Sequence, residues 1–243
     1  TCDNRFTKAV LYQLSYKGIN RLVTFLDFPV PTHIREDDIL QALSSMMLDK
    51  GLLVQDHRVS PYCPRCGTGL SDHELAQGYE DVVDASVYVR FPVTSGPLPE
   101  KYSGISLLSW TTTPWTLPGN RAISYSHKIS YGLYEVTANE RDFGPKIGEK
   151  YILANKLAEA VSGSAKITLA HVVDIPADAF ETMVCAHPLA HLGYSFDVPL
   201  LDGDHVTDDA GTGFVHTAPS HGREDFEIWM ANGQYLTNRK INT

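Results

Sequence analysis

Short segments of strand-forming residues recur from residue 87 onward, and they constrain the fold more than any other feature. Val87 to Phe91 alternates along its length, and Gly, Pro and Asp turn residues separate the segments that follow it. Those later segments are 105–110, 122–125, 129–136, 151–154, 166–173, 198–201 and 214–217. Many short strands at close spacing are typical of a β-barrel or a barrel-like sheet. One short helix, at 156–161, is predicted within the series.

The first 86 residues show a different, helical pattern. In 35–50, five apolar residues fall on one helical face, and acidic residues occupy the first turn, where they favour the positive end of the helix dipole. The chain therefore predicts an α+β, mainly β fold. A helical connecting segment spans 1–86, and a barrel-like domain spans 87–243.

Composition narrows the classes of protein. The 243 residues carry a net charge of −9 and only four cysteines, too few for a disulfide scaffold. No apolar run is long enough for a membrane span, and the polar beginning is unlike a secretory signal. We expect a cytoplasmic protein and no membrane partner. The acidic charge argues against a broad nucleic-acid surface, but it permits a pocket for one nucleotide end. The absence of an initiator methionine is expected of a piece of a longer protein.

A CxxC motif, Cys63-Pro64-Arg65-Cys66, precedes Gly67. Two thiolates on a tight turn can form half of a tetrahedral zinc site. No second CxxC or histidine pair follows, so two reduced thiols on a turn remain an equal alternative. A thioredoxin-type redox role is disfavoured, because no strand-to-helix pattern surrounds the motif.

The stretch WTTTPWTLPGN, from Trp110 to Asn120, follows the apolar segment 105–109. Two prolines and a glycine in so short a span disfavour a regular helix or a strand ladder. We expect a rigid loop at a strand end that presents several hydroxyls, where binding and catalytic residues commonly lie. A polar turn without a function is the alternative.

A second stretch, DDAGTGFVHTAPSHGREDFEIW, begins at Asp208. It predicts a glycine turn, a strand with His216 near its end, a loop, and a helix at 223–231 with Asp225 in its first turn. This order can bring His216 and Asp225 together. The pair is typical of a general base and its orienting carboxylate, or of a pocket with one charge for an ammonium group. A buried strand histidine and a helix-start carboxylate are the structural alternatives.

Taken together, WTTTPWTLPGN and GTGFVHTAPSHGREDF resemble the editing insertion (CP1) of isoleucyl-tRNA synthetases, class I. The segment CPRCGTGLSDHELAQGYEDVVDASVYVRFP resembles the lead-in to that insertion, and the resemblance covers roughly residues 50–232. Neither a HIGH-type nor a KMSKS-type motif occurs, so adenylate formation is not expected from this chain. The resemblance implies hydrolytic proofreading, the deacylation of Val-tRNA(Ile), with Val-AMP as a further candidate substrate.

The resemblance also implies roles for seven residues. Those expected to act in catalysis, by holding the ester and the attacking water or by binding the substrate ammonium, are Thr111, Thr112, Thr113 and Asp225. Those expected to bind or exclude the substrate are Trp115, Asn120 and His216. Among them, His216 would form the wall of the side-chain pocket that excludes isoleucine.

The implied partners are the 3′ end of tRNA(Ile) carrying valine and the remainder of the synthetase. Editing needs no cofactor. Some family members pair a CxxC before the insertion with one after it to bind zinc, so Cys63 and Cys66 would be half of such a site. A non-catalytic module, either tRNA-acceptor-binding or a zinc-ribbon structural piece, is the alternative from another class. An editing domain with another amino-acid preference is a third possibility.

Overall fold

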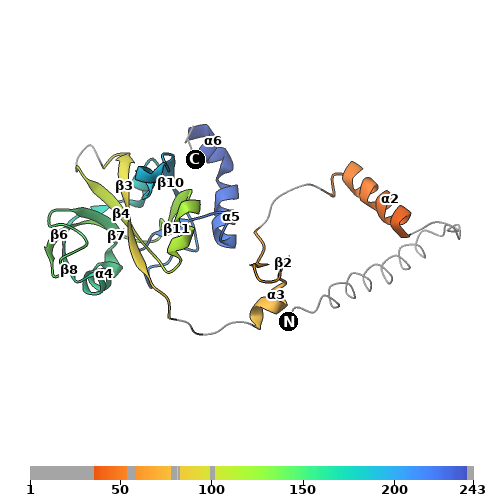
Figure 1. Ribbon diagram of the computed structural model, residues 1–243. Helices are drawn as coiled ribbons and strands as arrows, with labels where there is room; N and C mark the ends of the chain where they lie inside the picture. Colours follow the sequence, from red (N-terminus) through yellow and green to blue (C-terminus); the bar gives the residue numbers. More distant parts are fainter. Residues whose placement is uncertain (1–35, 54–58, 78–80, 82, 99–101, 240–243) are drawn as a thin grey trace. The chain divides into compact units, whose positions relative to one another are not determined.

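The computed structural model describes residues 36–53, 59–77, 81, 83–98 and 102–239 (Figure 1). Contacts divide the chain into two units, Thr1–Ser71 and Asp72–Thr243, and each is described by itself. The helical pattern expected in residues 1–33 lies outside the described residues. The boundary expected near residue 87 stays a prediction.

The first unit contains the helix expected at 35–50 and the CxxC motif. The helix is α2 (Glu36–Asp49). Strands β1 (Tyr62–Cys63) and β2 (Thr68–Gly69) form an antiparallel hairpin in which Cys63 pairs with Thr68. The CxxC motif is therefore the turn of a small hairpin.

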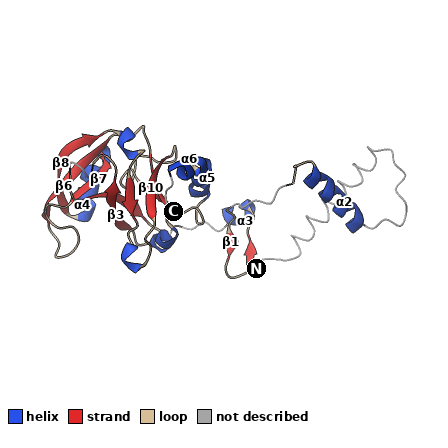
Figure 2. Ribbon diagram, turned by 90° about the horizontal axis from the view of Figure 1, so that it is seen from above, coloured by secondary structure: helices blue, strands red, loops and turns tan. Residues whose placement is uncertain are grey.

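The second unit contains one large sheet and several short helices (Figure 2). Its strands are β3 (Val87–Ser95), β4 (Ile105–Thr111), β5 (Ala122–Tyr125), β6 (Tyr131–Asn139), β7 (Lys150–Ala154), β8 (Ile167–Ile175), β9 (Val184–Ala186), β10 (Asp197–Asp202) and β11 (Val215–Thr217). Its α-helices are α3 (Asp72–Ala76), α4 (Ala158–Ala165), α5 (Arg223–Ala231) and α6 (Gly233–Arg239). Its 3-10 helices are η1 (Pro114–Gly119), η2 (Asn155–Leu157), η3 (Ala177–Phe180) and η4 (Ala190–Leu192).

The sheet is mainly antiparallel and open, so the mainly β prediction is confirmed and the barrel-like detail is wrong. The strand order is β11-β5-β10-β9-β3-β4-β7-β6-β8, and only the β5–β10 and β4–β7 pairs are parallel. A barrel requires every strand to pair on both sides. Among the described strands, β11 is only three residues long and pairs with β5 alone, while β8 pairs with β6 alone. Near β11, the Ser109 hydroxyl of β4 donates to the Phe214 carbonyl at 3.3 Å. This contact between β4 and the residue before β11 uses a side chain and is not a backbone strand pairing.

An aromatic cluster at the centre of the main core fixes the approach to β11. The rings of Tyr131 and Phe214 stack with centroids 4.7 Å apart, and Phe180 meets both rings edge-on. The Tyr131 hydroxyl donates to the Gly213 carbonyl at 2.8 Å and accepts from the Ser126 N–H at 3.0 Å. The buried hydroxyl is thus satisfied on both sides, and it ties the chain before β11 to β6.

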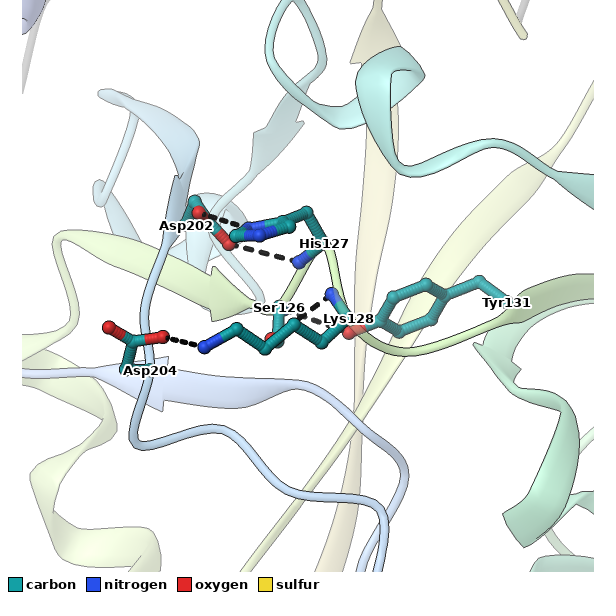
Figure 3. A network of polar contacts seen from close by, with 6 residues as sticks. All are labelled: Ser126, His127, Lys128, Tyr131, Asp202 and Asp204. Carbon is teal, nitrogen blue, oxygen red and sulfur yellow. Dashed lines mark hydrogen bonds and ion pairs between the residues drawn. The ribbon is translucent and has the colours of Figure 1, made fainter.

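The turn between β5 and β6 is tied to the end of β10 (Figure 3). Asp202 accepts from the backbone N–H of His127 at 3.0 Å and contacts the His127 ring at 2.7 Å. Lys128 pairs with Asp204 at 2.5 Å. Such exposed ion pairs contribute about 0–1 kcal/mol each, so their main effect here is to hold the turn.

Helices α5 and α6 pack against β5 and β10. Ile228 of α5 and Leu236 of α6 form a buried cluster with Ala122 and Leu201 of these strands. The first turn of α5 is thereby held beside the strand that pairs with β11. This packing positions Asp225 relative to His216.

Candidate functional site

The threonine stretch begins where β4 ends and continues as a 3-10 helix. Pro114 occupies the start of η1, where a missing N–H costs no hydrogen bond. The N–H of Thr116 bonds to the Thr113 carbonyl, and the N–H of Asn120 bonds to the Leu117 carbonyl, both at 3.0 Å. The sequence predicted a rigid loop without regular helix. The prolines are instead accommodated in the tighter helix, whose i to i+3 bonds suit short pieces.

The three consecutive threonines have different environments. Thr111 is buried, whereas Thr112 and Thr113 are exposed. The Thr111 hydroxyl accepts from the Thr113 N–H at 3.1 Å and lies 3.2 Å from the Thr113 hydroxyl. Trp115, on η1, is 63% exposed and so can offer its ring to a ligand. Thr111 therefore fixes the loop, and the two exposed threonines face solvent.

His216 joins β11 to η1, and its partners determine its tautomer. The Thr116 hydroxyl donates its proton to the Thr113 carbonyl at 2.8 Å and lies 2.9 Å from His216 Nε2. Because the Thr116 hydroxyl proton is already donated to the Thr113 carbonyl, the Thr116 oxygen can only accept a hydrogen bond from His216. The His216 Nε2 therefore carries a proton. Asn120 Nδ2 lies 3.4 Å from Nδ1, as a donor to the unprotonated nitrogen. Both partners therefore favour the neutral Nε2–H imidazole.

The electrostatics agree with a neutral His216. The pKa of its imidazole is lowered from 6.5 to about 4, mainly by burial and to a smaller extent by the charges of the neighbouring His221 and His187. Desolvation disfavours the charged ring, and a second positive charge nearby would add repulsion. At neutral pH this side chain is therefore uncharged.

Asn120 has one polar atom without a partner. Its Nδ2 donates to the Ala122 carbonyl at 2.9 Å and lies 3.4 Å from the Thr217 carbonyl. Its Oδ1 is buried and accepts no hydrogen bond from any described residue. Such a buried acceptor is costly unless it is satisfied. The predicted substrate-binding role of Asn120 is consistent with this oxygen, and it stays a prediction.

Asp225 lies in the first turn of α5, as the sequence predicted. Its Oδ2 accepts from the Ala218 N–H at 2.8 Å, which joins α5 to the loop after β11. Burial raises the pKa of this carboxyl, and the Ala218 hydrogen bond and the positive charge of His205 oppose that rise. No Lys or Arg of the described residues forms an ion pair with it. A partly buried carboxylate without a cation suits an ammonium ligand.

The loop between β11 and α5 returns to η1 through His221, a residue that the sequence reasoning missed. A Cβ on Gly119 would lie 2.8 Å from His221 Cε1, so the imidazole packs directly on that glycine. The Ser220 hydroxyl lies 2.8 Å from His221 Nδ1. The sequence did contain a signal for this residue, because His221 lies between the two predicted site residues His216 and Asp225.

A second histidine that the sequence reasoning missed, His187, forms a hydrogen bond to the backbone of η1. His187 is buried, and its Nε2–H donates to the Leu117 carbonyl at 3.0 Å. Its Nδ1 accepts from the Leu189 N–H at 3.1 Å, and its ring stacks on Tyr194. Burial lowers the pKa of His187, so this support is also uncharged.

The glycine turn before β11 serves packing. Gly211 and Gly213 have positive φ angles of 77° and 80°, as a sharp turn requires. A Cβ on Gly213 would lie 2.5 Å from the Ala154 Cβ, and one on Gly211 would meet the Trp110 ring at 3.4 Å. The close backbone approach at these glycines is therefore to β7 and β4 of the protein itself.

The CxxC motif places two thiols in the first unit. The Cys66 N–H lies 3.4 Å from Cys63 Sγ and lowers the pKa of that thiol, as a metal-binding turn would. Four donors are needed for a closed zinc site. Within the described ranges, no group of three or more His, Cys, Asp or Glu residues is placed to hold a metal. The described donor set does not complete a zinc site.

The structure brings five predicted or neighbouring residues into one hydrogen-bonded network: Thr111, Thr113, Thr116, Asn120 and His216. Asp225 joins the end of β11 through Ala218, and Trp115 lies on the same 3-10 helix. Cys63 and Cys66 belong to the other unit. No described helix has the length and apolar character that crossing a membrane requires.

Comparison with curated proteins identifies the family. The chain is 53% identical over 176 residues to the isoleucine–tRNA ligase of Agrobacterium fabrum and 54% identical over 179 residues to that of Bradyrhizobium diazoefficiens. Each match covers 72% of this chain and 18% of the relative. The matched part of the chain belongs to the isoleucyl-tRNA synthetase family. The predicted resemblance is confirmed, and the chain spans about a fifth of the length of these synthetases.

The chain was also compared with protein-family models and with solved structures. No family model matches the chain. Among solved structures, the editing domain of the cytosolic leucyl-tRNA synthetase of P. knowlesi is similar with a TM-score of 0.49 and 11% identity, covering 65% of each chain. The corresponding P. falciparum domain has a TM-score of 0.47 and 11% identity, covering 65% of this chain and 72% of that one.

Proposed function

We propose that the second unit hydrolyses valine from wrongly charged tRNA(Ile), as the editing part of an isoleucyl-tRNA synthetase. The observation that carries the proposal is the hydrogen bond from the Ala218 N–H to Asp225. It ties a carboxylate without a described Lys or Arg partner to the end of β11, the strand that holds the neutral, buried His216. An α-ammonium group needs one negative charge, and an aliphatic side chain needs an uncharged wall. Membership of the synthetase family supports the same assignment.

Asp225 is assigned to the substrate ammonium. One of its oxygens is held by Ala218, which fixes the direction of the carboxylate. The other oxygen accepts an N⁺–H bond, which is shorter and stronger than a neutral hydrogen bond. The ester carbonyl is then oriented toward the exposed threonines of the loop.

His216 is assigned to size exclusion. Thr116 and Asn120 hold its ring from both sides, so the wall is rigid and cannot retreat from a larger side chain. An aliphatic pocket alone distinguishes one methylene by only about 1–3 kcal/mol, a general value for which isoleucine against valine is itself the standard example. A second site that admits valine and clashes with isoleucine adds the missing discrimination.

Thr112 and Thr113 are assigned to the ester and the attacking water, while Thr111 supports their geometry. Asn120 Oδ1 offers a buried acceptor to a substrate hydroxyl or amine, and Trp115 offers an exposed ring to the terminal adenosine. Positioning and exclusion of bulk water supply most of the acceleration. The tRNA acceptor end and the remainder of the synthetase are the proposed partners.

The test is deacylation of Val-tRNA(Ile) by the purified chain, with D225N and E224Q compared. Both variants remove one negative charge from the first turn of α5, but Glu224 is exposed. Losing one member of a partly buried charge pair costs about 2–5 kcal/mol, so D225N is expected to slow hydrolysis on the order of 30- to 5,000-fold. E224Q is expected to retain the wild-type rate. Equal rates for D225N and E224Q would refute the ammonium role, and tRNA binding without turnover by the wild type would favour a non-catalytic module.

A further inference from the structure

Two of the histidines that contact η1, His216 and His221, differ in their ability to accept a proton. Both ring nitrogens of His216 contact protein partners, and burial lowers its pKa to about 4. A general base must be within reach of solvent or substrate and must have a free nitrogen. His216 therefore lacks a free nitrogen that could take a proton from water.

His221 meets both requirements. Its Nδ1 contacts the Ser220 hydroxyl at 2.8 Å, which orients the ring, and its Nε2 makes no hydrogen bond to a described residue. The ring is exposed and packs on Gly119, the last residue of the threonine-bearing 3-10 helix. The free nitrogen therefore belongs to a side chain that is held at the edge of the proposed site.

The charge of His221 acts on two of the other site residues. A positive His221 lowers the pKa of Asp225 and also lowers the pKa of His216. The helix η1 on which it packs carries no charged residue. Arg223 pairs with Glu227 at 2.9 Å, which limits its repulsion of a protonated ring. The ionisable groups around His221 on β11 and α5 are His216, Arg223, Glu224, Asp225 and Glu227.

We propose that His221 is the general base of the hydrolysis, with Ser220 as its positioning residue. This inference rests on the proposed function. As the water oxygen bonds to the ester carbonyl carbon, His221 Nε2 takes the proton that the water loses. The tetrahedral intermediate then collapses, the bond from carbon to the ribose oxygen breaks, and the ribose oxygen receives that proton. The products are free valine and tRNA with its terminal hydroxyl restored.

The test measures kcat and KM for Val-tRNA(Ile) from pH 5 to 8 in the wild type and in H221Q. General-base catalysis contributes about 10²- to 10⁴-fold, so kcat is expected to fall by that factor with KM nearly unchanged. Wild-type kcat is expected to rise with pH, because a general base acts only in its unprotonated form. H221Q is expected to lack this rise. Imidazole added to H221A is expected to restore part of the rate, which a purely structural role would not allow.

The outcome is decided by comparing the H221Q and H221A variants with the wild type, with D225N and with a control variant. H191Q removes another exposed histidine, on η4, and is expected to retain the wild-type rate and pH profile. If the wild type hydrolyses Val-tRNA(Ile) and D225N does not, a wild-type rate in H221Q would overturn this inference alone. The inference would also be overturned if H221Q were slower but kept the pH profile of the wild type, and if added imidazole did not raise the rate of H221A. If the wild type does not hydrolyse the ester, the proposed function fails and this inference fails with it.

Discussion

Replacing His216 by Gln is expected to remove a defined part of the acid sensitivity of the fold. The pKa of His216 is about 4 in the folded state, against an ordinary value of 6.5 that the unfolded chain would show. The unfolded state therefore binds more protons between these two values, and stability falls as the pH decreases through this window. The full effect is about 3 kcal/mol once the pH is below both values.

Between pH 7 and pH 5 the effect of His216 is about 2 kcal/mol. The wild type is expected to lose this much more free energy of unfolding over that interval than H216Q, which cannot take up a proton there. Other titrating groups, such as Asp225 with its raised pKa, contribute to both proteins and cancel in the comparison. The sign follows from the lowered pKa, because a raised value would stabilise the fold on acidification.

The assay is urea unfolding followed by tryptophan fluorescence at the two pH values. All three tryptophans, Trp110, Trp115 and Trp229, lie in the second unit, so the signal reports on the unit that holds His216. H191Q, which removes an exposed histidine, is the matched control and is expected to follow the wild type. Equal losses of stability in the wild type and H216Q would show that His216 is not held neutral by burial.

Three further predictions concern the turns and the metal. G213A is expected to lower the free energy of unfolding by about 1–3 kcal/mol in urea titration, because its Cβ would lie 2.5 Å from the Ala154 Cβ at a positive φ angle; unchanged stability would contradict the close packing. G119A is expected to displace the His221 ring and to lower kcat for Val-tRNA(Ile) by about tenfold or more with little change in melting temperature. EDTA is expected to leave the deacylation rate unchanged, since the proposed steps use no metal; a rate that zinc restores would contradict this.

The strands of the second unit were largely predictable because alternation and turn residues act locally. Segment 122–125 was predicted at its observed bounds as β5, and helix 223–231 as α5. The alternating segment at 87–91 continues as β3 to Ser95, because Pro92 is the last residue to pair with β4 and pairing with β9 starts at Val93. A proline is tolerated where a strand changes partner.

Features that depend on long-range packing could not be predicted from the sequence. β9 has only three residues, too few to show a period, and the pairing that leaves the sheet open is not encoded in any one strand. In α5 two apolar residues differ in exposure, since Met230 is 55% exposed whereas Ile228 is buried against α6 and the sheet. The direction in which a helix meets its neighbours decides which residues are covered.

The proposed site shows the same division. The motifs pointed to His216 and Asp225 at the two ends of one loop, and the structure places them there. The hydrogen bond from His216 to Thr116 and the packing of His221 on Gly119 join residues about a hundred positions apart. Neither contact has a local pattern, so only the folded chain shows them.

The most direct test of the account compares hydrolysis of Val-tRNA(Ile) and Ile-tRNA(Ile) by the same purified chain. The neutral, rigidly held His216 predicts that the valyl ester is cleaved at least about tenfold faster, and that H216A cleaves the isoleucyl ester as well. Equal rates for the two esters in the wild type, or no hydrolysis of either, would contradict the account.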